Sequence, residues 1–131
     1  MYKKIKDKLK KYPLITGLYE IYKQRFLSFY KNIYKTNYSR HLLISYITSP
    51  LRKGIIKRHS NYLELSIILE TFKSFKFNID FADYTYKGKI NYKKYDLIFG
   101  FGYPFGKALR VKDAKSAIKI CYETGSLKLF I

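Results

Sequence analysis

A glycine-rich turn that follows an apolar run in the sequence is the first candidate for ligand binding. The segment from Tyr95 to Gly106 is YDLIFGFGYPFG, in which three large apolar residues are followed at once by Gly100 and Gly102. An apolar run without polar alternation indicates a strand that is buried on both faces. Open α/β sheets bind ligands at turns behind the carboxyl ends of parallel strands. The two glycines could admit a ligand close to the backbone or serve the turn geometry alone, and their spacing leaves both roles open.

A second candidate loop contains His59 and Asn61 within the sequence HSNYLE. Ser60 or Asn61 is the predicted N-cap of a helix, and Glu64 lies near the third helical position, as in a capping box. Because the amide groups at a helix start attract anions, His59 could help to bind an anionic ligand at this entry. A capping or packing role for His59 is the alternative.

A third turn, ETGS, follows an apolar run near the end of the chain. Since all three turns follow predicted parallel strands, we expect them to lie together around one cleft at one edge of the sheet. The predicted acceptor-binding or ligand-binding residues are His59, Asn61, Gly100, Gly102, Thr124 and Gly125.

Other well-known sites fit this chain less well. Dinucleotide binding requires GxGxxG after the first strand, but the glycines here are spaced GxGxxxG after the third, and Asp83 alone is weak support for a ribose site. A P-loop motif is absent from the sequence. His41 and His59 form no HExxH motif, so we predict no metal site. The single cysteine, Cys121, lies in the apolar run IKICY and is predicted to be buried.

The hydrophobic pattern predicts the elements that must position these loops. Strands are expected at residues 41–47, 76–82, 95–101 and 117–122, with a helix over residues 60–75 and a short one at residues 104–109. Strands joined in this way form βαβ units, so the predicted fold is α/β, a parallel Rossmann-like sheet with flanking helices. The buried face of the longer helix is expected to contain Leu65, Ile68, Leu69 and Phe72.

The first 40 residues are predicted to be a basic amphipathic extension of a domain that covers residues 41–131. They contain eleven lysines and arginines but two acids, and apolar residues recur at helical spacing from Ile15 to Ile33. We therefore expect a helix over residues 13–35, with Leu18, Tyr22, Phe26 and Phe29 also on its apolar stripe. Such a helix could lie at a membrane interface or could pack on the domain.

The net charge of the chain, +18, favours an anionic partner. The sequence is also rich in the residues of AT-rich codons, so a low-GC genome is a second explanation for the many lysines. No membrane span or signal peptide is recognisable, and a cytoplasmic protein, peripheral at the inner face of the membrane, is expected. Charge and aromatic content without a binding motif support nucleic-acid binding only non-specifically.

In order and spacing, the segments HSNYLE, FNIDFADY, YDLIFGFG and YETGS resemble the N-terminal half of bacterial glycosyltransferases of the GT-B architecture. The likeness is to enzymes of capsule and other surface polysaccharide synthesis, and it covers about residues 41–126. Besides the six predicted binding residues, the matching positions include Glu64, Asp96 and Tyr122. The resemblance implies transfer of a sugar from a nucleotide-sugar to a glycan or lipid-linked acceptor, which this half would mainly bind.

The resemblance also implies that the nucleotide-sugar donor binds a separate C-terminal domain, so we expect no cofactor in this chain. The chain is then expected to be a truncated or split enzyme that is poorly stable and inactive alone, and whether it is an enzyme stays open. A non-enzymatic basic module that binds nucleic acid or an anionic membrane is the alternative function.

Overall fold

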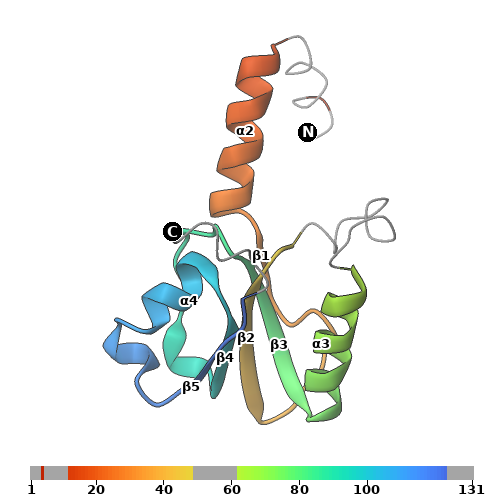
Figure 1. The fold of residues 1–131 in the computed structure, drawn as a ribbon, viewed down its shortest axis with the longest axis vertical. Coiled ribbons are helices and arrows are strands. Elements are labelled where there is room, and N and C mark those ends of the chain that lie inside the picture. Colours follow the sequence, from red (N-terminus) through yellow and green to blue (C-terminus); the bar gives the residue numbers. More distant parts are fainter. Residues whose placement is uncertain (1–3, 5–11, 49–61, 124–131) are drawn as a thin grey trace.

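The computed structural model describes residues 4, 12–48 and 62–123. Strand β2 (Arg40–Tyr46) runs through the centre of its five-stranded sheet (Figure 1). The strand order is β1-β3-β2-β4-β5. Strands β2 to β5 are parallel, and β1 is antiparallel to β3. The α/β class and the parallel arrangement of the four predicted strands are confirmed. The other strands are β1 (Phe29–Tyr30), β3 (Phe77–Asp83), β4 (Leu97–Gly100) and β5 (Ile118–Cys121).

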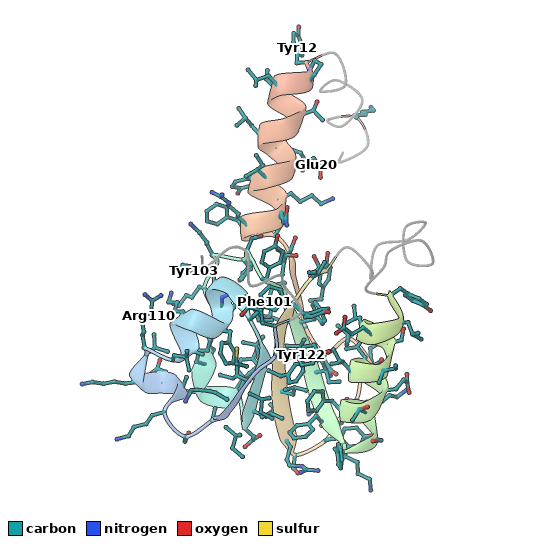
Figure 2. The ribbon with its side chains drawn as sticks, viewed as in Figure 1. Tyr12, Glu20, Phe101, Tyr103, Arg110 and Tyr122 are labelled. Carbon is teal, nitrogen blue, oxygen red and sulfur yellow. The ribbon has the colours of Figure 1, made fainter. Side chains whose placement is uncertain are left out.

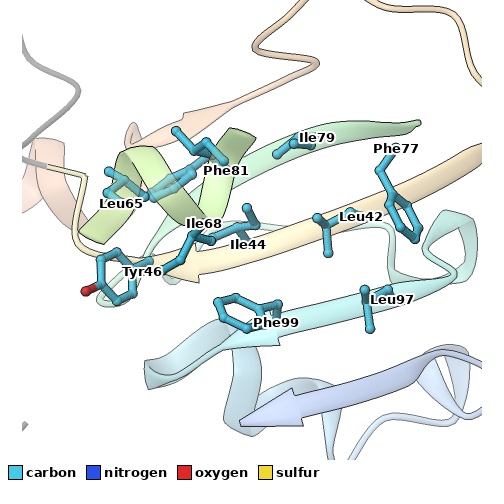
Figure 3. Packing of buried hydrophobic residues seen from close by; sticks show 11 residues of the cluster. Leu42, Ile44, Tyr46, Leu65, Ile68, Phe77, Ile79, Phe81, Leu97 and Phe99 are labelled. Atoms are coloured by element: carbon cyan, nitrogen blue, oxygen red, sulfur yellow. The ribbon is translucent and has the colours of Figure 1, made fainter. Parts of the chain in front are cut away.

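The apolar core lies on both faces of the sheet, because successive residues of β2 point to opposite faces. Leu42 and Ile44 belong to the core cluster on one face (Figure 3), and Leu43 belongs to the cluster on the other. All three side chains are fully buried. This two-sided burial explains why the strand sequence shows no polar alternation.

Helix α3 (Tyr62–Ser74) covers the first face, and helix α4 (Gly102–Ala108) lies on the other side of the sheet (Figure 1). Leu65, Ile68 and Leu69 of α3 are buried, and Phe72 packs edge-on against Phe99 with 5.0 Å between ring centroids. The predicted apolar face of this helix is therefore confirmed. Two short 3-10 turns, η2 (Tyr92–Lys94) and η3 (Lys112–Ala114), complete the layer that contains α4.

Helix α2 (Pro13–Phe26) projects away from the sheet (Figure 1) and contains no buried residue. The prediction that it continues through residue 35 is wrong. The chain leaves the helix after Phe26, and Asn32 and Lys35 take positive φ angles of 43° and 52°. A helix cannot accommodate such residues, so the apolar pattern of residues 13–35 combines a helix with a strand.

Two residues expected on the helical stripe contact strand β3 instead. Phe29 in β1 pairs with Ala82 of β3, and the backbone amide of Ile33 donates a hydrogen bond of 2.9 Å to the carbonyl oxygen of Ile79. Both side chains pack on core clusters, on opposite faces. Pairing with a distant strand has therefore overridden the local helical periodicity.

The prediction that Cys121 is buried is also wrong, since this cysteine is exposed. Cys121 ends β5, which is the last strand of the sheet within the described residues. Ile118 in the same strand is 66% exposed, so the apolar sequence of β5 does not report burial. An edge strand has one neighbour in its sheet, and its side chains lose cover when no helix lies over them.

Candidate functional site

The carboxyl ends of β2, β3, β4 and β5 lie at one edge of the sheet, which we call the carboxyl edge. In the strand register, Tyr46 is level with Asp83, and Ser45 is level with Gly100. Gly100 and Gly102 lie at this edge. The other four predicted binding residues, His59, Asn61, Thr124 and Gly125, lie outside the described part of the chain, so their convergence with the glycines stays a prediction.

Both glycines have positive φ angles, 124° at Gly100 and 88° at Gly102. A Cβ atom on Gly100 would lie 1.8 Å from the carbonyl oxygen of Ser45, and one on Gly102 would lie 2.4 Å from that of Tyr84. The protein's own backbone therefore occupies the space beside each glycine. Turn geometry and close strand approach account for both residues without a ligand.

The most distinctive polar group at the carboxyl edge is the Glu64 cluster, formed by Glu64, Tyr46 and Tyr122. The hydroxyl of Tyr46 donates a hydrogen bond of 3.0 Å to Oε2 of Glu64, and the hydroxyl of Tyr122 donates to Oε1. The bond to Glu64 is the main cause that raises the pKa of Tyr122, so this tyrosine stays a donor. Two donors, one at the end of β2 and one directly after β5, thus hold one carboxylate of α3.

The two tyrosines that hold this carboxylate belong to a group of packed aromatic rings. The ring of Tyr46 lies edge-on to Phe101 at 5.7 Å and at 6.3 Å from Tyr122, and Tyr84 lies 5.3 Å from Phe101. A pocket of about 360 Å³ opens beside the cluster. A site of this composition can accept hydrogen bonds from hydroxyl groups and pack apolar faces of a ligand against its walls. The pocket is lined by Leu63, Glu64, Ile67, Ile68 and Tyr122.

Asp83, the residue weighed as a ribose ligand, has a structural role instead. Its side chain is 2% exposed and accepts hydrogen bonds from the amide and hydroxyl groups of Thr48, at 3.2 and 2.7 Å. Its other oxygen accepts from the amide and hydroxyl of Thr85, at 3.0 and 2.5 Å, and from Gln24 at 3.3 Å. Asp83 therefore ties the ends of β2 and β3 to helix α2, and these five bonds occupy its lone pairs.

The sequence predicts a capping-box role for Glu64 and does not link it to the two tyrosines. The family resemblance includes both Glu64 and Tyr122, and it is the signal in the sequence for their importance. Tyr46 carried no such signal, because it ends a strand pattern in which any large apolar residue would fit. The three residues meet only because β2, α3 and β5 all end or begin at the carboxyl edge.

No protein family, curated protein or solved structure matches this chain. Among the described residues, no three or more His, Cys, Asp or Glu side chains are grouped so that they could hold a metal ion. None of the described helices is long and apolar enough to cross a membrane. The geometry of the carboxyl edge and the sequence resemblance are therefore the grounds for a functional proposal.

Proposed function

We propose that the Glu64 cluster binds a glycan acceptor and that this chain is the acceptor-side α/β unit of a glycosyltransferase of surface glycan synthesis. The observation that carries the proposal is the Glu64 carboxylate, which two tyrosine hydroxyls hold beside an open pocket at the carboxyl edge. Sugars offer hydroxyl donors and apolar C–H faces, and a carboxylate beside a tyrosine ring and aliphatic side chains complements both. The resemblance to GT-B glycosyltransferases supports the same assignment.

We assign Glu64 to binding of the acceptor and not to catalysis of sugar transfer. An ionised carboxylate has about four lone-pair positions, of which the two tyrosines use two, so acceptor hydroxyls can occupy the rest. In the enzymes that this chain resembles, the nucleotide-sugar donor binds mainly to a second domain. Sugar transfer would therefore need a donor-binding domain, on the same polypeptide or on a separate one.

The substitution Glu64→Gln tests this site. It keeps the side-chain shape but removes the charge, and hydrogen bonds to charged groups contribute about 1.5–3 kcal/mol. We expect oligosaccharide affinity to fall about 10- to 100-fold, as measured by calorimetry against a panel of surface-glycan oligosaccharides. Tyr122→Phe, which removes one donor and keeps the ring, should give a smaller loss.

Glu70→Gln is the matched control for this experiment. Glu70 is an exposed residue of the same helix that does not line the pocket, so its substitution changes the net charge equally. We expect it to leave oligosaccharide binding unchanged. Equal affinities for the parent protein and Glu64→Gln would refute an acceptor site at this position.

We also propose that α2 lies on an anionic membrane surface, which would bring a lipid-linked acceptor to the domain. Its apolar side chains point into solvent along its length (Figure 2), and Leu14 is 79% exposed. Leu14, Leu18 and Ile21 share one side of the helix, because residues three and four apart are neighbours. Lys23 and Arg25 in the last turn could pair with acidic headgroups.

Flotation with phosphatidylglycerol vesicles tests the membrane role. The double substitution of Leu14 and Leu18 by serine should weaken vesicle binding at least about tenfold, because each buried leucine contributes about 1.5–3 kcal/mol. Binding of the parent protein should fall as salt is added. Serine at Leu109 and Ile118, which are similarly exposed elsewhere, is the control. Deletion of residues 1–40 would also remove β1, which pairs with β3 in the sheet. The serine substitutions therefore test the membrane role more directly than this deletion. Undiminished binding of the α2 variant would exclude this role.

A further inference from the structure

A second cavity, of about 430 Å³, lies away from the Glu64 cluster and shares no residue with its pocket. It is formed by β1, by the loop that follows β3 and by the residues that lead into β4. Its tyrosines belong to the core cluster on the face that carries α4, whereas Tyr46 belongs to the cluster under α3. We call it the lysine cleft. It is lined by Phe29, Lys31, Tyr86, Lys89, Ile90, Asn91, Lys94 and Tyr95.

The floor of the lysine cleft is aromatic and neutral. Tyr95 is 3% exposed, and its hydroxyl donates a hydrogen bond of 2.6 Å to Oδ2 of Asp80. Burial and this bond raise the pKa of Tyr95, so the ring carries no charge at neutral pH. Tyr86 is also buried, and its ring lies 5.4 Å from that of Phe29. Both tyrosines line the cleft together with the partly exposed ring of Phe29, so the floor is apolar.

The rim of the cleft is cationic. Lys94 lies 2.5 Å from Oδ2 of Asp80, a buried carboxylate beneath the cleft. Burial alone would raise the pKa of Asp80, but the hydrogen bonds from Lys94, Tyr95 and the Asn32 amide hold it below its ordinary value, so Asp80 is ionised and neutralises Lys94. Within the described part of the chain, no acidic side chain forms an ion pair with Lys31 or Lys89.

The cleft is therefore lined by two lysines that pair with no acidic side chain among the described residues, together with aromatic rings, and no carboxylate is among its lining residues. Two positive charges match the charge of a phosphate monoester, and lysine donates charge-assisted hydrogen bonds to phosphate oxygens. Asn91 adds a neutral donor at the rim. The volume lies within the range of small-molecule sites, which is about 300–1,000 Å³, so the cleft has room for more than a phosphate.

We propose that the lysine cleft binds a phosphate group carried on a ring or a hydrocarbon chain, with the phosphate at Lys31 and Lys89 and the apolar part on Tyr86, Tyr95 and Phe29. A nucleotide and an isoprenyl phosphate share this chemistry. The assignment does not depend on the Glu64 cluster, because the two pockets share no lining residue.

The test compares two double variants that change the net charge equally. Lys31→Gln with Lys89→Gln removes the uncompensated lysines of the cleft, and Lys107→Gln with Lys115→Gln removes two lysines that do not line it. Calorimetric titrations use inorganic phosphate, uridine monophosphate and geranyl phosphate as separate probes. Because the whole chain is strongly basic, the control pair measures how much of any binding is general electrostatic attraction.

We expect one of the two organic phosphates to bind saturably and about tenfold tighter than inorganic phosphate. The tighter of the two identifies the source of the ligand. The cleft variant should lose about tenfold or more of this affinity, and the control variant should stay within about twofold of the parent. An equal loss in both variants, equal affinity for all three probes, or binding to duplex DNA without saturable binding of any small probe would overturn the proposal.

Discussion

Replacement of Gly100 by alanine is expected to unfold the protein. Gly100 has a φ of 124°, which L residues rarely adopt, and such strain costs about 1–3 kcal/mol. The added Cβ would also lie 1.8 Å from the carbonyl oxygen and 2.8 Å from the carbonyl carbon of Ser45. These are backbone atoms of the central strand β2, so no side chain can rotate to relieve the clash. We expect a loss of more than about 4 kcal/mol, which is a large part of the total stability of an ordinary domain.

Gly106→Ala is the matched control for this substitution. Gly106 lies in helix α4, and a Cβ added there would meet nothing within 4 Å. Alanine is preferred to glycine inside a helix, so the free energy of unfolding should rise by about 0.5–1 kcal/mol. Urea unfolding followed by circular dichroism measures both variants, together with the yield of soluble protein. A Gly100→Ala protein within about 1 kcal/mol of the parent would show that β4 can move away from β2 at little cost.

Asp83→Ala is expected to have the second-largest effect, a loss of about 3 kcal/mol, because several hydrogen-bond donors lose their acceptor. The buried carboxylate accepts five hydrogen bonds, and its removal leaves the amide and hydroxyl of Thr48 and those of Thr85 without this acceptor. Each buried donor that loses its partner costs about 1–3 kcal/mol. Because Gln24 also donates to Asp83, hydrogen exchange in α2 should become faster in this variant.

Asp113→Ala provides the comparison for a solvent-exposed aspartate. Asp113 forms a surface pair with Lys93 at 3.9 Å, and its side chain is 56% exposed. Exposed pairs of this kind contribute little, so the free energy of unfolding should change by less than about 0.5 kcal/mol. If Asp83→Ala is as stable as Asp113→Ala in urea, the bonds to Thr48 and Thr85 do not hold the carboxyl edge together.

The amino-acid sequence by itself determined the α/β class and the four parallel strands. These elements have strong local signals, namely the apolar runs around Ile44 and Ile98 and the helical spacing of Leu65, Ile68 and Leu69. For Gly100 and Gly102 the sequence left a turn role and a ligand-binding role open, and their positive φ angles show that the turn requires glycine at both positions. In each of these cases the residues that carry the signal are close together in the chain.

Tertiary structure alone decided the features that depend on distant residues. Phe29 fits a helical stripe as well as it fits a strand, and its pairing with Ala82 settles the choice. Cys121 has an apolar neighbourhood in sequence, but the outer position of β5 exposes it.

The Glu64 cluster and the lysine cleft are both formed by segments that lie far apart in the chain. Tyr46, Glu64 and Tyr122 come from β2, from α3 and from the segment after β5, whereas Lys31 and Lys89 follow β1 and β3. Local periodicity carries no information about which of these segments the fold brings together. Periodicity reports which face of one element is apolar, and the order of strands in the sheet decides what that face meets.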